Sequence, residues 1–262
     1  MPHPIVLLHG WACSAAYWKP LADRLSASGR HVVAADLPGY GSDLRAGYDW
    51  TVENVAATLA EQSDEGPVHW VGHSLGGSIA ATIAARFPRT TASLTLVGMV
   101  PVAPSPATVE KLARLFGGES SDPEADLAAG EELIGAWFRG GNEPQGEDRE
   151  TFLAPFKRCP AVVRQSLPAG VTGAAPDVAE LVSAPTLVVT GSRDATRPPA
   201  AVAEFLSRHP AWRHASVPDA GHMVHWEQPA ACAEAILRHI ESAENADARA
   251  AWPDGSRAGP PA

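Results

Sequence analysis

The feature that most constrains the fold is a regular alternation of short apolar runs with helix-like segments. Four β-rich runs lie at residues 5–8, 31–35, 68–71 and 93–97, and two more lie at 186–190 and 213–217. Helix-like segments separate or follow them at residues 16–26, 74–86, 199–208 and 229–241, with a further one that starts at Thr51. Such alternation predicts a parallel sheet covered by helices on both faces. We therefore expect an α/β fold with about six mostly parallel strands.

The alternation stops between residues 101 and 183. This stretch contains no clear strand, many Gly, Pro and acidic residues, and helix candidates at 127–138 and 160–167. It is too long for a loop inside a compact domain. We expect a helical cap insertion over the carboxyl edge of the sheet, where ligands bind in such folds. The predicted organisation is a core at residues 1–100 and 184–243, a cap at 101–183 and a disordered tail at 244–262.

Composition excludes several classes of function. The chain has 20 Lys and Arg against 30 Asp and Glu, a net charge of −10, so it lacks the basic clusters that nucleic-acid binding requires. Cys13, Cys159 and Cys232 show neither paired nor metal-binding spacing, which favours a reducing compartment and cytoplasmic residence. No apolar stretch reaches the length of a membrane span. We expect no nucleic acid, membrane or metal partner.

Gly72-His73-Ser74-Leu75-Gly76 follows a β-rich run and opens a helix. A serine on a tight turn between strand and helix adopts a strained backbone conformation, so its neighbours must lack bulky side chains. Such a turn lifts the hydroxyl clear of the sheet and points helical N–H groups at the bound ligand. The alternative is a helix N-cap serine in a glycine-rich turn. Ser74 is the predicted nucleophile.

A serine hydroxyl needs a base near neutral pH. Of the ten histidines, His222 is the best candidate, because it lies in the loop after the last predicted strand and before the final helix. We expect His73 to pack in the interior and His9 to brace the first turn. His225 either lines the site or packs against Trp226, and packing is favoured.

The acid that orients this base is predicted to be Asp194, which follows the strand at 186–190. Asp219 is a rival, but only three residues separate it from His222, too few for an easy approach to the far imidazole nitrogen. Asp36 is favoured as a turn residue. The order Ser, Asp, His is the one expected of this motif. The backbone N–H groups of Leu75 and Trp11 are the candidate oxyanion donors.

Together these residues resemble the α/β-hydrolase superfamily. His9-Gly10-Trp11, the turn at residues 36–42, the Ser74 turn, Asp194 and Gly221-His222 stand in the family's order. The first 80 residues resemble small carboxylesterases, including the pimeloyl-ACP methyl ester esterase group, and the plant methyl-esterase and hydroxynitrile-lyase group. The resemblance implies an α/β-hydrolase fold. Only residues 1–4 precede the first motif strand, where the family has an antiparallel hairpin, so we expect a reduced sheet.

The implied activity is hydrolysis of a carboxylic ester, thioester or lactone of a small, fairly hydrophobic substrate through an acyl-enzyme on Ser74, without cofactor. Met99, Val100 and Met223 are candidate substrate-binding residues. Alternatives are a C–C bond hydrolase, a lactonase or a hydroxynitrile-lyase-like enzyme on the same triad, or a non-catalytic ligand receptor.

A carrier-protein substrate is a further alternative, which an anion-binding lid of arginines could recognise. The candidates for that lid are Arg139, Arg149, Arg158 and Arg164. Residues 101–183 contain 13 acidic and 7 basic side chains, however, a net charge of −6. A solvated, mixed-charge surface is therefore the favoured interpretation of these arginines.

Overall fold

The structure, a computed structural model, describes residues 2–41, 48–63, 66–102, 104–117, 122–138, 142–175 and 177–251, with side chains as far as residue 246. Within these residues six strands form one parallel sheet in the order β2-β1-β3-β4-β5-β6. The strands are β1 (Ile5–Leu8), β2 (Val32–Ala35), β3 (Val68–His73), β4 (Thr91–Val97), β5 (Thr186–Gly191) and β6 (Arg213–Val217). This confirms the predicted six-stranded parallel α/β sheet.

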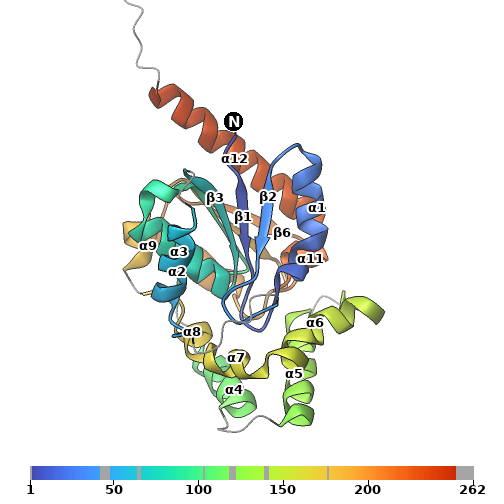
Figure 1. The fold of residues 1–262 in the computed structure, drawn as a ribbon. Helices are drawn as coiled ribbons and strands as arrows, with labels where there is room; N and C mark the ends of the chain where they lie inside the picture. Colours follow the sequence, from blue (N-terminus) through green and yellow to red (C-terminus); the bar gives the residue numbers. More distant parts are fainter. Residues whose placement is uncertain are drawn as a thin grey trace, which may run out of the picture.

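Alternate strand residues face two separate apolar clusters. Leu8, Trp70 and Leu96 belong to one cluster, and Leu7 and Val97 belong to the other. The first face is covered by α2 (Val52–Glu61), α3 (Leu75–Arg86), α9 (Val178–Leu181) and α10 (Pro199–Arg208). The second is covered by α1 (Lys19–Ala27), α11 (Val224–Glu227) and α12 (Pro229–Ala251). Figure 1 shows α2, α3 and α9 on one side of the sheet, and α1 and α11 on the other.

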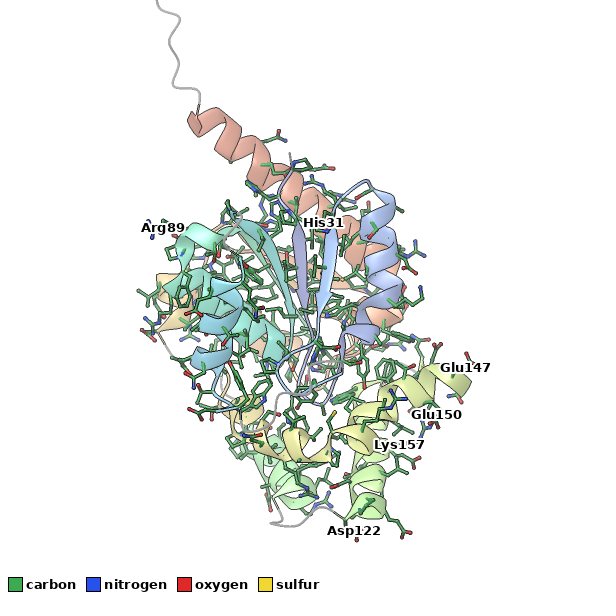
Figure 2. The ribbon with its side chains drawn as sticks, in the orientation of Figure 1. His31, Arg89, Asp122, Glu147, Glu150 and Lys157 are labelled. Atoms are coloured by element: carbon green, nitrogen blue, oxygen red, sulfur yellow. The ribbon has the colours of Figure 1, made fainter. Side chains whose placement is uncertain are left out.

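Residues 101–183, here called the helical segment, connect β4 to β5. Their described part holds six helices and no strand: α4 (Pro106–Phe116), α5 (Pro123–Trp137), α6 (Gly146–Arg158), α7 (Pro160–Gln165), α8 (Leu167–Thr172) and α9. In Figure 1, α4 to α8 gather at one end of the sheet, the end toward which the strand arrows point. Figure 2 shows the charged side chains of Asp122, Glu147, Glu150 and Lys157 on the outside of this region.

The C-terminal helix is longer than predicted. α12 continues to Ala251, so residues 244–251 are helical where the sequence analysis expected a tail. Ala243 is buried, and Glu244 accepts hydrogen bonds from both terminal nitrogens of Arg30, at 2.5 and 2.8 Å. These long-range contacts fix the helix near residues 243 and 244, and Figure 1 shows its end extending past the sheet. Residues 252–262 lie outside the described part of the chain.

The helices in the described part of the chain differ from membrane-spanning segments. None of them combines the length and the apolar character that a membrane-spanning helix needs.

Candidate active site

Ser74 is the single residue between β3 and α3. Its backbone has φ 50° and ψ −115°, one of three positive φ values at non-glycine residues in the described chain. The close packing of this turn explains its glycines: a Cβ at Gly72 would lie 2.2 Å from the carbonyl oxygen of Gly76, and one at Gly76 would lie 2.2 Å from that of Leu8. The turn therefore holds Ser74 in a conformation that side-chain-bearing residues rarely adopt, half-buried at the sheet edge.

His222 and Asp194 meet on neighbouring loops after β6 and β5. The His222 Nδ1 atom lies 2.9 Å from Asp194 Oδ2, and the two side chains are 8% and 0% exposed. Burial acts to raise the pKa of Asp194, but the charge of His222 and the hydrogen bonds from His222 and Thr196 outweigh it and lower this pKa. The carboxylate is thus ionised near neutral pH. Because Nδ1 faces Asp194, Nε2 is the nitrogen left for another partner.

Two residues that the sequence analysis did not select complete this loop. The Thr196 hydroxyl donates to Asp194 Oδ1 at 2.7 Å and lies 2.7 Å from His222 Nδ1. The backbone N–H groups of Thr196 and Arg197 also donate to Asp194 Oδ1, at 2.8 and 3.2 Å. This is the local pattern of an aspartate that caps its own turn. The sequence offered one signal for Thr196, namely a hydroxyl-bearing residue two positions after the predicted acid.

Ser74 and His222 line the same cavity, which has a volume of about 290 Å³. Loops at the sheet edge and helices of the helical segment build its wall together. The described lining residues are Trp11, Cys13, His73, Ser74, Pro104, Ala107, Thr108, Lys111, Leu112, Leu133, Ala136, Trp137, Gly170, Ala195, Thr196, Arg197 and His222. The wall is mainly apolar, as small-molecule sites are.

A smaller cavity of about 20 Å³ shares Ser74, Pro104, Gly170 and Arg197 with the first. It is also lined by Leu75 and by two of the predicted substrate-binding residues, Met99 and Val100. The third, Met223, is fully buried in the larger apolar cluster and is absent from the described lining of either cavity.

The candidate oxyanion donors lie beside Ser74. Trp11 lines the larger cavity and Leu75 the smaller one, and both cavities include Ser74. Among the described residues, neither backbone N–H donates to another backbone or side-chain group. Two amide donors without internal acceptors are available to a ligand there. The Trp11 side chain is engaged elsewhere, since its Nε1 donates to the carbonyl oxygen of Val163 at 2.9 Å.

The other histidines near the site are packed in the interior. The Nε2 of His73 donates to the carbonyl oxygen of His222 at 3.1 Å, and the Nε2 of His9 accepts from the Leu37 N–H at 2.9 Å. His225 packs on Trp18, with ring centroids 4.3 Å apart, rather than on Trp226. Burial lowers the pKa of His225 to about 3 and that of His9 to about 4. Burial also lowers the pKa of His73, so all three histidines are neutral near pH 7.

The rival acid and the arginine lid lie away from Ser74. Asp219 is exposed and bonds to Arg193 on the neighbouring loop. Arg149 and Arg164 form ion pairs with Glu131 and Asp126 inside the helical segment. None of the described lid candidates lines the Ser74 cavity, and Arg139 lies outside the described residues.

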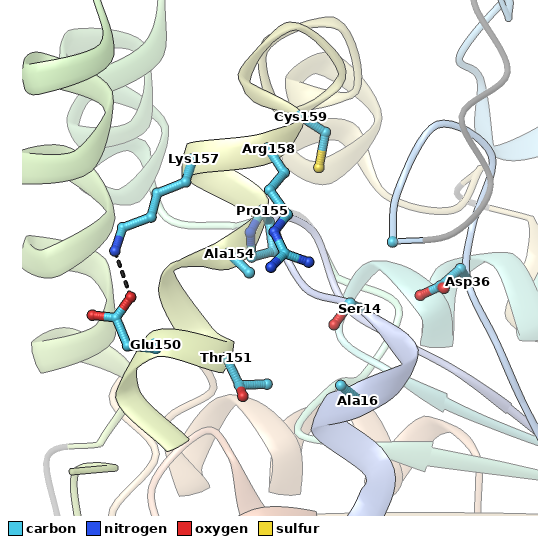
Figure 3. A pocket seen from close by; sticks show the side chains of 11 residues that line it. Ser14, Ala16, Asp36, Glu150, Thr151, Ala154, Pro155, Lys157, Arg158 and Cys159 are labelled. Atoms are coloured by element: carbon cyan, nitrogen blue, oxygen red, sulfur yellow. Dashed lines mark hydrogen bonds and ion pairs between the residues drawn. The ribbon is translucent and has the colours of Figure 1, made fainter. Parts of the chain in front are cut away.

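Arg158 lines a different cavity of about 400 Å³, between α6 and the residues after β1 and β2. Figure 3 shows Arg158 and Cys159 on one wall of it, and Ser14 and Asp36 on the other. The Asp36 carboxylate accepts from the Ala15 N–H at 2.7 Å, so it supports a turn, as predicted. Burial raises the pKa of the Cys159 thiol, which disfavours the nucleophilic thiolate. In the described residues no cluster of His, Cys, Asp and Glu could hold a metal ion.

Known proteins resemble this chain in sequence. A pimeloyl-[acyl-carrier protein] methyl ester esterase from Neisseria meningitidis is 29% identical over 222 residues, 78% of this chain and 80% of that protein. A protein of the same name from Sodalis glossinidius is 42% identical over 103 residues, 39% of this chain and 37% of its own length. The chain thus spans little more than a third of this second relative.

Solved structures share the fold. An esterase from Thermogutta terrifontis, determined with malate bound, has a TM-score of 0.76 and 26% identity and covers 93% of this chain and 91% of its own. A bromoperoxidase from Bacillus anthracis has a TM-score of 0.81 at 21% identity, covering 92% of each chain, which shows the fold alone. The model of the alpha/beta hydrolase family matches residues 5–235. This chain therefore belongs to the alpha/beta hydrolase family, as the sequence motifs predicted.

Proposed function

We propose that this protein is a serine hydrolase that cleaves carboxylic esters, with Ser74, His222 and Asp194 as its catalytic triad. The observation that carries the proposal is the position of Ser74. It sits on a strained turn in the wall of the cavity that His222 also lines, and Asp194 holds the Nδ1 of His222. An activated serine requires a base in reach and a third group that orients the base.

In the proposed reaction, Ser74 Oγ attacks the ester carbonyl carbon while His222 Nε2 accepts the hydroxyl proton. The N–H groups of Leu75 and Trp11 bind the oxyanion of the tetrahedral intermediate. The C–O bond to the alcohol breaks, and His222 returns the proton to the leaving alcohol. Water, deprotonated by His222, then hydrolyses the acyl-enzyme and releases the acid. The buried Asp194 carboxylate stabilises the imidazolium formed in each step.

The cavity favours a small and fairly hydrophobic substrate. Its volume of about 290 Å³ and its largely apolar wall suit a short acyl or alcohol chain. Met99 and Val100 would contact the part of the substrate nearest Ser74. We further propose that the helical segment acts as a cap domain that sets substrate choice. Cytoplasmic residence stays a prediction from the cysteine pattern.

A second candidate substrate is an acyl methyl ester carried on a protein. The names of the Neisseria and Sodalis relatives favour it, since both are called pimeloyl-[acyl-carrier protein] methyl ester esterases. Methanol release from a methyl-esterified acyl carrier protein, compared with the same acyl methyl ester free in solution, tests this candidate. A higher kcat/KM for the carried ester would support it, and a higher kcat/KM for the free ester would refute it.

The triad itself is tested with p-nitrophenyl acetate and butyrate. We expect Ser74→Ala to lower kcat by a factor of roughly 10⁴ or more, because no nucleophile remains. Ser14→Ala is the matched control, since Ser14 lines the separate cavity beside α6, and it should retain wild-type turnover. Equal rates in wild type and Ser74→Ala would refute Ser74 as nucleophile.

Related enzymes and a receptor are distinguished by two further assays. Lactones, β-diketones and cyanohydrins show whether the triad serves lactone opening, C–C cleavage or cyanohydrin cleavage instead. Labelling of Ser74 by a fluorophosphonate together with steady ester turnover would refute a non-catalytic receptor.

A further inference from the structure

The wall of the Ser74 cavity has the opposite charge to the chain. The protein carries a net charge of −10. Among the described residues that line the cavity, Lys111 and Arg197 are the charged side chains, and no Asp or Glu lines it. In the described lining of the smaller cavity, Arg197 is the sole charged residue. A cationic enclosure in an acidic protein favours an anionic ligand.

The two cations differ in their partners. The Lys111 Nζ lies 3.0 Å from the Glu132 carboxylate, which neutralises it. Arg197 forms no ion pair with a described carboxylate at the distance of a salt bridge. Its Nη1 donates to the carbonyl oxygen of Thr196 at 2.9 Å, and its buried Nε has no hydrogen-bond acceptor among the described residues. A guanidinium offers five N–H donors, so most of its binding capacity is unused.

Asp194 is the nearby charge, but its oxygens are occupied. Oδ2 accepts from His222, and Oδ1 accepts from the hydroxyl and the N–H of Thr196 and from the backbone N–H of Arg197. Burial lowers the pKa of Arg197, and the charge of Asp194 offsets this only in part. Arg197 is partly exposed, but its Nε atom is buried without an acceptor among the described residues, and a ligand carboxylate would satisfy it through paired N–H donors.

Arg197 also lies in the wall of the cavities that contain Ser74, the proposed nucleophile. It lines both the larger and the smaller cavity, and Ser74 lines both as well. A carboxylate bound to Arg197 therefore shares one enclosure with an ester bound at Ser74. The larger cavity has a volume of about 290 Å³, which limits such a molecule to a short chain.

We propose that Arg197 is a specificity-determining residue that binds a free carboxylate on the substrate, so that the preferred substrates are monoesters of short dicarboxylic acids. This proposal rests on the proposed ester hydrolysis at Ser74 and names its substrate class. Binding through charge-assisted hydrogen bonds at a partly buried site is expected to change kcat/KM by roughly tenfold or more.

The test compares monomethyl adipate with methyl hexanoate by methanol release at pH 7.5. The two esters have the same chain length and leaving group and differ in a terminal carboxylate. For the wild type, we expect kcat/KM to be roughly tenfold higher for monomethyl adipate. Arg197→Met should abolish this preference, and Arg197→Lys should keep part of it, because the charge stays but the planar pair of donors is lost.

The control is Arg193→Gln. Arg193 lies on the same loop, is exposed and bonds to Asp219, so its loss should leave the preference intact. The ratio of the two kcat/KM values is the measured quantity, because displacement of Asp194 or partial unfolding lowers both activities equally.

Three results would overturn the proposal. The first is a wild type that hydrolyses methyl hexanoate as well as monomethyl adipate. The second is an Arg197→Met variant whose ratio equals that of the wild type. The third is an Arg193→Gln variant that loses the preference to the same extent. If instead the wild type cleaves neither ester and Ser74 resists a fluorophosphonate, the proposed hydrolysis itself fails.

Discussion

The sheet region and the helical segment enclose the same cavity but hold their side chains by different means. In the sheet region, strand ends and tight turns fix Ser74, Asp194 and His222, and the carboxylate accepts several hydrogen bonds. The helical segment contributes apolar side chains from its helices, such as Leu133 and Trp137, to the wall. Some of its charged groups form ion pairs on the outside, as Lys157 does with Glu150, whereas Arg164 and Asp126 pair in its interior.

Hydrogen bonds from donors in the sheet region to backbone carbonyl oxygens of the helical segment join the two parts. The Tyr17 hydroxyl donates to the carbonyl oxygen of Phe152 at 2.7 Å, and Trp11 donates to that of Val163. The backbone N–H of His222 donates to the carbonyl oxygen of Trp137 at 3.0 Å. The residues of the proposed triad thus come from the sheet region alone, whereas the cavity wall comes from both regions. Changes at the proposed triad should therefore alter the rate on every ester, and changes in the cavity wall should alter selectivity.

The largest effect is expected at the acid in the sheet region. Asp194→Asn should lower kcat by a factor of roughly 10³ to 10⁴ on short and long esters alike, because the imidazolium of His222 loses its stabilising charge. Steady-state kinetics on p-nitrophenyl acetate and hexanoate measure this. Asp219→Asn is the control, since Asp219 is exposed and bonds to Arg193. A fall in kcat on only one of the two esters would contradict the prediction that Asp194 affects the rate on every ester.

A smaller effect is expected from the wall in the helical segment. Leu133 is 4% exposed and lines the cavity, so Leu133→Ala should lower the ratio of kcat/KM for hexanoate over acetate by roughly fivefold to tenfold. Leu127→Ala is the control, because Leu127 belongs to the same helix but is absent from the described lining. An equal loss of kcat on both esters would show instead that α5 supports the triad directly.

The smallest effect concerns ion pairs and stability. Glu244 in the sheet region is 28% exposed and bonds to Arg30, so Glu244→Gln should lower the free energy of unfolding by about 1 kcal/mol at pH 7. In the helical segment, Glu150 pairs with Lys157 and is more exposed than Glu244. Glu150→Gln should therefore change the free energy of unfolding little. Urea denaturation of both variants measures the difference. A larger loss of unfolding free energy in Glu150→Gln than in Glu244→Gln would contradict this prediction.

The pH dependence of the Glu244 contribution follows from its pKa. The hydrogen bond from Arg30 lowers this pKa from an ordinary value of 4.5. The stabilisation is therefore fully present above pH 4.5 and is lost as the pH falls through the lowered folded value. Wild type and Glu244→Gln should converge in stability below that window, and a constant difference down to pH 2 would contradict the assignment.

Local patterns predicted the sheet closely. Most strands are short apolar runs bounded by turn residues, although β6 is largely polar and exposed. The helix predicted to start at Thr51 is present, and the Thr51 hydroxyl caps it by accepting from the Asn54 N–H. The helical segment was harder to predict, because α6 contains Pro155 and has a polar exposed face, so its periodicity is weak. The end of α12 was predicted too early, since contacts between Glu244 and Arg30 are distant in sequence.

The sequence by itself determined the family, the parallel sheet and the identities of Ser74, Asp194 and His222 as candidates, because these depend on short-range turns and on strand order. Only the tertiary structure decided which residues form the cavity wall. It placed Arg197 in the wall of the Ser74 cavity, brought Thr196 to His222 and buried Met223 in the core. The reason is physical: a turn is fixed by steric limits over a few residues, whereas a wall depends on how helices from distant parts of the chain pack over the sheet.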